Sequence, residues 1–187
     1  DQTITDQRRG NGVYASLRET MSSLREQSKL FGCSITVQNH NMEAVLGDSF
    51  VSEMETAGCR GMIYVEYVPI DQSSESLAPG PEERKYIARR VDALRAAHPD
   101  IIIISFPGDE QAAGGFFHIN AYGGAEPCPF SAHSDCSLKN MSLKEAMHSP
   151  LFTKLRTSGV LEEPHVGSCT LFLQDAKVKA LEKGENV

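Results

Sequence analysis

The sequence predicts an α/β fold, and three observations carry that prediction. Apolar residues recur at helical spacing in three segments, short apolar or β-branched runs follow these segments, and the two patterns alternate up to residue 107. From residue 108 the composition changes to a region rich in glycine and proline. We therefore expect two domains, residues 1–107 and residues 108–187.

The first helix and strand are predicted between residues 12 and 38. Apolar side chains in residues 12–30 are spaced by four, four and three positions, as on one face of a helix. We expect Gly32 to end this helix in the left-handed conformation. Residues 33–38 are short and β-branched and lie between turn residues, which predicts a strand.

Two further helix and strand pairs follow. A helix capped by Asp48 or Ser49 runs to Gly58, and residues 61–70 form the next strand. Pro81 suits the first turn of a third helix. The four consecutive isoleucines at 101–104 then predict a strand that is buried on both faces, as in parallel sheets.

This order predicts right-handed βαβ units, with ligand chemistry at the carboxyl ends of the strands. Three units are too few to close a barrel, and three strands are too few for a complete doubly wound sheet. We therefore expect them to belong to a larger (β/α) layer whose beginning is missing. The chain also opens at Asp1 without an initiator methionine, which leads to the same expectation.

The second domain is predicted to hold a hairpin and several helices. Residues 116–120 are strand-like, and a turn is expected near Tyr122. A capping box at 142–145 begins a short helix, Ser149 and Pro150 begin another that runs through Arg156, and residues 170–183 form the last helix.

Composition excludes several classes of protein. The 187 residues carry a formal net charge of -7, which disfavours non-specific binding to the phosphate backbone of nucleic acid. No apolar run approaches the roughly 18 residues of a membrane span, and the first residues lack a signal-peptide pattern. We expect a cytoplasmic protein with no membrane partner.

The five cysteines suggest either metal chemistry or buried thiols. An odd number in a cytoplasmic chain argues against a disulfide framework. Cys33 and Cys59 have apolar neighbours and are expected to be small core residues, whereas Cys128, Cys136 and Cys169 lie where loops can converge. Zinc would combine these thiols with histidines, from the set Cys128, His133 or Cys136, His165 and Cys169. Iron-sulfur chemistry usually needs four thiolates, and scattered structural thiols are the third possibility.

Other candidates rest on single residues. Glu66 lies in an apolar strand and is either buried with a partner or exposed at an edge. The pair Arg8 and Arg9 either holds an anion or is simply solvated, while Ser34 and Asn41 are placed to touch a ligand at the sheet edge. A role in stabilising a turn explains Asn41 equally well. Serine-triad, Walker and dinucleotide motifs are absent from the sequence.

Three segments of the first domain together resemble the later part of a radical S-adenosylmethionine (SAM) enzyme barrel. They are TDQRRGNGVY at 5–14, CSITV at 33–37 and YVEYVP at 64–69. Further along, FFHIN at 116–120 and YGG-x-EPCPF at 122–130 resemble the SPASM/twitch-type extension of that family. The resemblance covers nearly the whole chain.

The resemblance implies the later βα units of a partial (β/α) TIM-like barrel with a C-terminal hairpin-plus-helices extension. It implies that Cys128, Cys169 and Cys136 hold an auxiliary [4Fe-4S] cluster, and that Arg9 and Ser34 contact SAM. It further implies a small-molecule or peptide substrate and an electron donor such as flavodoxin or ferredoxin.

The chain also departs from that family. The Cys-x3-Cys-x2-Cys loop that binds the SAM-reducing cluster is absent, as is the cysteine expected before Gly123. This chain alone is therefore not expected to generate a radical. We expect a fragment, or segments joined across missing loops near Gly114 and Gly115. The alternative is a zinc-stabilised or degenerate binding domain without radical chemistry.

Overall fold

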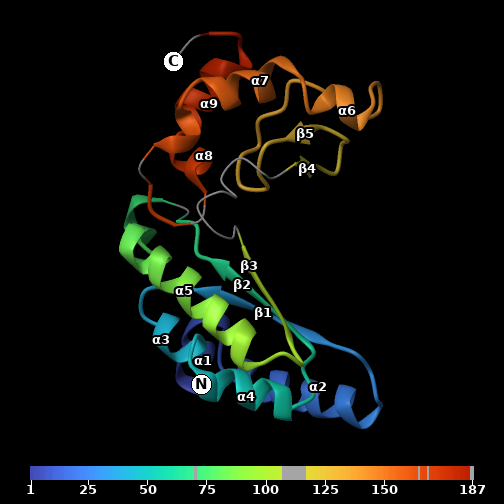
Figure 1. Ribbon diagram of the computed structural model, residues 1–187, viewed down its shortest axis with the longest axis vertical. Helices are drawn as coiled ribbons and strands as arrows, with labels where there is room; N and C mark the ends of the chain where they lie inside the picture. The colour runs from blue at the N-terminus through green and yellow to red at the C-terminus, as the bar shows by residue number, and fades with distance from the viewer. Residues whose placement is uncertain (70, 107–116, 164, 168, 186–187) are drawn as a thin grey trace. The chain divides into compact units, whose positions relative to one another are not determined.

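The computed structural model describes all residues except 70, 107–116, 164, 168 and 186–187 (Figure 1). The chain forms two compact units. Unit 1 comprises residues 1–67 and 82–106, and unit 2 comprises residues 68–81 and 107–187. The segment 68–81 thus groups with the C-terminal region. The expected break near Gly114 and Gly115 lies outside the described residues.

Unit 1 is built on a parallel three-stranded sheet of order β1-β2-β3 (Figure 1). The sheet aligns Ser34 with Ile63 and Ile63 with Ile104. This arrangement confirms the predicted alternation of helices and strands. The elements are α1 (Gln2–Arg9), α2 (Val13–Glu26), β1 (Gly32–Val37), α3 (Met42–Val45), α4 (Asp48–Thr56), β2 (Gly61–Glu66), α5 (Pro81–Ala97) and β3 (Ile102–Phe106).

Gly32 does not end a helix as predicted. Helix α2 stops at Glu26, and Ser28 takes the left-handed conformation with φ 54°. Gly32 instead begins β1, where a Cβ atom would lie 2.8 Å from the carbonyl oxygen of Gly61. The glycine is therefore explained by close approach of two strands. The N-cap of α4 is Gly47, so the predicted caps at Asp48 and Ser49 are also wrong.

Helices of unit 1 pack on one face of the sheet. Alternate strand residues such as Met62, Tyr64 and Ile103 join the core, which the helices complete. The helix residues of that core include Met21, Val51, Met54, Ile87, Val91 and Leu94. The opposite face is open, because Ile63, Ile102 and Ile104 are 41%, 68% and 46% exposed. The prediction that the isoleucine strand is buried on both faces is therefore wrong.

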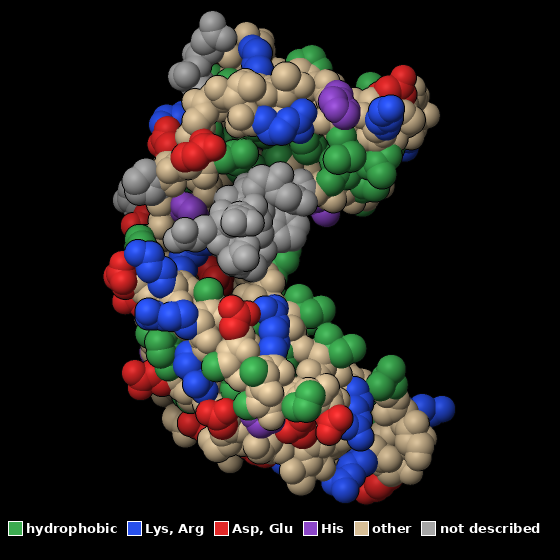
Figure 2. Space-filling view, viewed as in Figure 1, with side chains coloured by type: hydrophobic (Ala, Val, Ile, Leu, Met, Phe, Trp, Pro, Cys, Tyr) green, Lys and Arg blue, Asp and Glu red, His purple; other side chains and the backbone are tan. Residues whose placement is uncertain are grey.

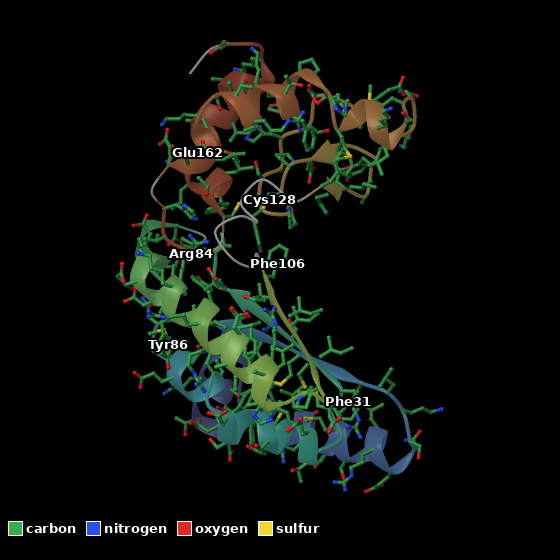
Figure 3. The ribbon with its side chains drawn as sticks, viewed as in Figure 1. Phe31, Arg84, Tyr86, Phe106, Cys128 and Glu162 are labelled. Carbon is green, nitrogen blue, oxygen red and sulfur yellow. The ribbon has the colours of Figure 1, made fainter. Side chains whose placement is uncertain are left out.

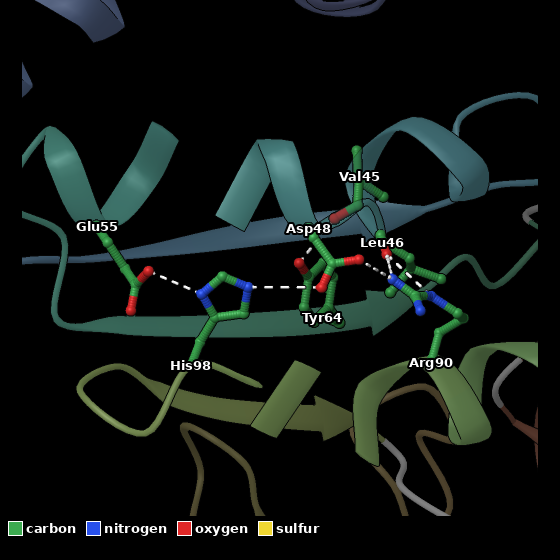
Figure 4. Close-up of polar contacts among 7 residues, drawn as sticks. All are labelled: Val45, Leu46, Asp48, Glu55, Tyr64, Arg90 and His98. Carbon is green, nitrogen blue, oxygen red and sulfur yellow. Dashed lines mark hydrogen bonds and ion pairs between the residues drawn. The ribbon is translucent and has the colours of Figure 1, made fainter. Parts of the chain in front are cut away.

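Hydrogen bonds join the covered face to the chain around α3 (Figure 4). The hydroxyl of Tyr64 donates to the carbonyl of Val45 at 2.7 Å. The guanidinium of Arg90, on α5, donates to the carbonyl of Leu46 at 2.9 and 3.2 Å and contacts Asp48 at 3.0 Å. These bonds satisfy the carbonyls of the last residue of α3 and of the residue that follows it.

The C-terminal part of unit 2 contains a hairpin followed by short helices. Strands β4 (His118–Ile119) and β5 (Ala125–Glu126) pair antiparallel, as predicted, and Ser142 forms the predicted capping box with Glu145. The predicted last helix is broken at Gln174. The remaining elements are η1 (Gln72–Leu77), α6 (Leu143–Ala146), α7 (Pro150–Thr157), η3 (Val160–Glu162), α8 (Thr170–Leu173) and α9 (Asp175–Glu182).

Two apolar clusters stabilise unit 2. One gathers residues of α7, η3, α8 and α9 around Cys128 and Cys169. The other gathers Ala125, Ala146 and Phe152, with Phe117 stacked on Phe152 at a ring-centroid distance of 5.2 Å. Across the described part of the chain, no helix has the length and apolar character needed to cross a membrane.

Candidate functional site

Two cysteines far apart in the sequence meet inside unit 2. The Sγ atoms of Cys128 and Cys169 lie 3.1 Å apart, although 41 positions separate the residues. Both thiols are free, and the residues are only 7% and 4% exposed. This buried dithiol, Cys128 with Cys169, is the candidate functional site (Figure 3 labels Cys128).

Local structure places each thiol. Cys128 follows β5 and begins a tight turn in which the N–H of Ser131 donates to its carbonyl at 3.0 Å. Pro129 occupies the second position of that turn, where its fixed φ is favourable. Cys169 directly precedes α8 as its N-cap residue. Side chains from neighbouring elements enclose the pair, namely Leu151, Leu155, Val160, Leu171, Val178 and Leu181.

The hydrogen bond between the two thiols shifts their pKa values in opposite directions. A hydrogen bond from Cys169 lowers the pKa of Cys128 to about 7, helped by the backbone N–H of Phe130 and by the charge of His118, although burial opposes the shift. The same bond and burial raise the pKa of Cys169, despite backbone N–H groups of Leu171 and Phe172. Cys128 is therefore the member of the pair that becomes a thiolate near neutral pH.

The hairpin before Cys128 carries a polar pair that sequence reasoning missed. Strand register places His118 opposite Glu126, and Nδ1 of His118 lies 2.7 Å from Oε2 of Glu126. The amide of Asn120 donates to the other carboxylate oxygen at 2.6 Å. Glu126 is only 7% exposed, so these partners compensate its burial. Pairing the two strands about a turn at Tyr122–Gly124 would have revealed the contact.

Cys136 does not join the dithiol. It packs against the separate cluster around Phe152, where burial and the carboxylate of Asp135 raise the pKa of its thiol while the Ser149 side chain opposes this. Within the described residues, no group of three or more His, Cys, Asp or Glu side chains is arranged to hold a metal ion. The structure thus brings together two of the three predicted ligands.

The histidines of the suggested zinc set have other partners. His133 lies between Asp175 and Glu182, with its ring nitrogens 2.8 and 2.9 Å from their carboxylate oxygens. The ring of His165 is 3.0 Å from the hydroxyl of Thr170. Both rings therefore have explanations that need no metal ion.

Unit 1 holds a second cysteine pair. The Sγ atoms of Cys33 and Cys59 are 3.7 Å apart, and the thiol of Cys59 also donates to the carbonyl of Gly61 at 3.1 Å. Burial, together with the neighbouring Cys59, raises the pKa of Cys33 to about 12. The Cys33 thiol therefore stays protonated at neutral pH, and both residues pack in or against the core of unit 1 as expected.

The predicted SAM-contacting residues lie on the surface of unit 1. Arg9 is exposed in the last turn of α1, and Ser34 is exposed on the open face of the sheet. Asn41 is buried, and its side chain accepts from the N–H of Gln38 and donates to the carbonyl of Thr36. The side chain of Asn41 therefore stabilises the loop that follows β1.

Glu66 is buried at the carboxyl end of β2 and has a partner. Its side chain is 3% exposed, and Oε2 lies 2.9 Å from Nε of Arg84 on α5 (Figure 3 labels Arg84). Burial raises the pKa of Glu66, and Arg84 opposes that shift. Of the two alternatives open from the sequence, the structure shows the buried, partnered carboxylate.

No protein-family model matches the chain, and a search of curated proteins finds no match.

Proposed function

We propose that this chain is part of a radical SAM iron-sulfur enzyme, one that cleaves SAM reductively and abstracts hydrogen from a small-molecule or peptide substrate. In this proposal unit 2 contributes Cys128 and Cys169 to an auxiliary [4Fe-4S] cluster, with Cys136 as a further candidate. The observation that carries it is the meeting of two buried thiols from distant parts of the chain.

The donor chemistry of the pair suits an iron-sulfur cluster. Cys128 has a lowered pKa, and backbone N–H groups at Phe130, Leu171 and Phe172 favour negative charge on the two sulfurs. Two thiolates on one tetrahedral metal ion such as zinc lie roughly 3.8 Å apart, from bonds of about 2.3 Å, so the pair would open by less than 1 Å from 3.1 Å to share one ion. In a [4Fe-4S] cluster each of four cysteines binds a different iron, so Cys128 and Cys169 would have to separate further and would supply two of the four ligands.

A bound cluster would supply electron transfer or substrate positioning. The chain's own contribution is to hold the thiols and to exclude water. The apolar side chains around the pair keep its surroundings dry, which strengthens each N–H to sulfur interaction.

The sheet of unit 1 supports the proposal of a partial barrel. In a (β/α) barrel the helices cover the outer face of the strands, and branched side chains fill the interior. Unit 1 has helices on one face and Ile63, Ile102 and Ile104 on the other. Ser34 shares this open face, which favours its proposed contact with SAM, and Arg9 remains the second proposed contact.

The proposed setting is the cytoplasm, with an electron donor such as flavodoxin or ferredoxin. The net charge of -7 disfavours a nucleic-acid partner. Figure 2 shows Lys and Arg interspersed with Asp and Glu over unit 1 on the face in view. Mixed charge of this kind favours solubility and lacks the one-sign patch that nucleic-acid binding uses.

Anaerobic reconstitution of the full chain with iron and sulfide tests the proposal. We expect a brown protein whose visible absorption and bound iron are lost in the Cys128→Ser and Cys169→Ser variants. The matched control is the Cys33→Ser, Cys59→Ser double variant, which removes the other dithiol and should reconstitute like the parent. A colourless parent protein would contradict the proposal.

A zinc-stabilised binding domain without radical chemistry is the second candidate. It is favoured by the number of thiols brought together, because zinc accepts two cysteines and completes its set with other ligand types. One colourless zinc per chain, lost in Cys128→Ser, would support it. A chain that retains neither metal would indicate a degenerate binding domain.

A further inference from the structure

We propose that Cys128 and Cys169 form a reversible intramolecular disulfide when the chain meets a hydroperoxide. Their sulfurs are 3.1 Å apart in the free dithiol. A disulfide bond is about 2.05 Å long, so the sulfurs have to approach by roughly 1 Å. Cys128 lies in a turn and Cys169 directly before a short helix, two places where such a shift disturbs no long regular element.

The reaction balances with the peroxide as the only oxidant. The Cys128 sulfur attacks one peroxide oxygen, the O–O bond breaks, and water leaves as the sulfenic acid forms. The Cys169 sulfur then attacks the Cys128 sulfur, the S–O bond breaks, and a second water leaves. In total two thiols and one hydrogen peroxide give one disulfide and two waters. A small dithiol reverses the step by exchange.

The surroundings assign the two roles. Either sulfur can be the donor in the hydrogen bond between them, and Cys128 is the more exposed of the two, at 7% against 4%, so Cys128 is assigned as the sulfur that attacks the peroxide and Cys169 as the resolving thiol. Both side chains are buried, which limits attack to small oxidants. Because the resolving sulfur is already in contact, a sulfenic acid at Cys128 is captured before further oxidation.

The second dithiol, Cys33 with Cys59, can be compared with the Cys128 and Cys169 pair as a site of oxidation. Cys33 and Cys59 are 3.7 Å apart, and the thiol of Cys59 is already bonded to the carbonyl of Gly61. Burial raises the pKa of the Cys33 thiol to about 12. We therefore expect oxidation to select the pair in unit 2.

The disulfide has a regulatory consequence, and this part rests on the proposed function. A pair joined as a disulfide offers no thiolate to a metal or cluster. Oxidation and cluster loading would then compete for the same two sulfurs.

The test uses the full-length, metal-free chain with Cys136→Ser, because Cys136 is the nearest cysteine in sequence to Cys128. After exposure to hydrogen peroxide, free thiols are alkylated and the protein is digested for mass spectrometry. We expect a loss of two hydrogens, a Cys128 to Cys169 cross-linked peptide, and recovery of both thiols with dithiothreitol. Adding Cys33→Ser and Cys59→Ser should leave the cross-link unchanged.

Three results would overturn the disulfide. They are a sulfinic acid on Cys128 with Cys169 still alkylated, a Cys33 to Cys59 cross-link that forms as fast, or no loss of hydrogens. Mapping the parent chain gives the same answer without any variant, so a variant that misfolds does not obscure it. If the cross-link forms but no iron or zinc binds, the disulfide stands and the proposed function fails.

Discussion

At the scale of single residues, the chemistry of Cys128 depends on its neighbour. Burial alone would raise the pKa of a thiol, yet the hydrogen bond from Cys169 outweighs it. The sequence marks both cysteines as candidates, but it does not show that one of them donates to the other.

Replacing Cys169 with alanine should raise the pKa of Cys128 above its value of about 7, because the hydrogen bond that lowers it most is lost while burial remains. The pH dependence of thiolate absorption or of alkylation measures the change. Thiolate forms above the pKa, so the variant should show less of it at neutral pH. Cys33→Ala serves as the control and should leave the midpoint where it is.

Glu66 is a second residue whose ionisation depends on one contact, the ion pair with Arg84. Arg84 compensates the buried carboxylate, so Arg84→Met leaves a charge without a partner. Breaking such a pair costs about 3 kcal/mol or more at neutral pH. Urea unfolding of parent and variant measures the loss.

The pH dependence of that loss follows from its cause. The pKa of Glu66 already lies above 4.5, and removal of Arg84 raises it further. The penalty is therefore present above the folded-state pKa and fades at lower pH, where Glu66 takes up a proton. A Glu66→Gln, Arg84→Met double variant should lose this pH dependence, and equal losses at all pH values would contradict the explanation.

At the scale of elements, His133 ties the loop after the hairpin to α9. Its two ring nitrogens face carboxylates at both ends of that helix, Asp175 and Glu182. Glu182 also accepts from the backbone N–H of Ser134 at 3.0 Å. Burial disfavours the charged ring, but the hydrogen bonds to Glu182 and Asp175 prevail and raise its pKa above 6.5.

His133→Gln should therefore destabilise the protein more in acid than in alkali. A raised histidine pKa stabilises the folded state below its ordinary value, and this is lost as pH rises through the folded-state pKa. The thermal midpoints of parent and variant should differ most near pH 5.5 and converge near about pH 8.5. His148→Gln, at an exposed position, is the matched control, and a gap that widens with pH would refute the role.

At the scale of the whole molecule, the sheet of unit 1 presents two unlike faces. Alternate residues of β3 separate them, because Ile103 is 5% exposed and Ile102 is 68% exposed. An open apolar face of this kind is unusual for a parallel sheet, whose two faces are ordinarily both covered.

Lysine substitutions distinguish the faces. Ile103→Lys should cost more than about 3 kcal/mol because it buries an unpaired charge, whereas Ile102→Lys should stay within about 0.5 kcal/mol. Chemical unfolding measures both variants. Similar losses for the two would show that the face of Ile102 is covered in solution.

The helices and strands of this chain can be predicted from its sequence better than the tertiary contacts between them. The three strands, their alternation with helices, the hairpin and the capping box at Ser142 follow from local patterns, and the structure contains them. Gly32 was misread because the same residue suits a helix end and a close strand contact. Arg84 could not be named as the partner of Glu66, because 18 positions separate them and Arg60 lies nearer in the sequence.

The sequence by itself determined the α/β class, the parallel sheet and the candidate thiols, since helix and strand periodicity act over a few residues. Only the tertiary structure decided that Cys128 meets Cys169, that Cys136 does not, and that helices cover one face of the sheet. The physical reason is that such contacts depend on how packed elements fold back on one another. No spacing along the chain records that arrangement.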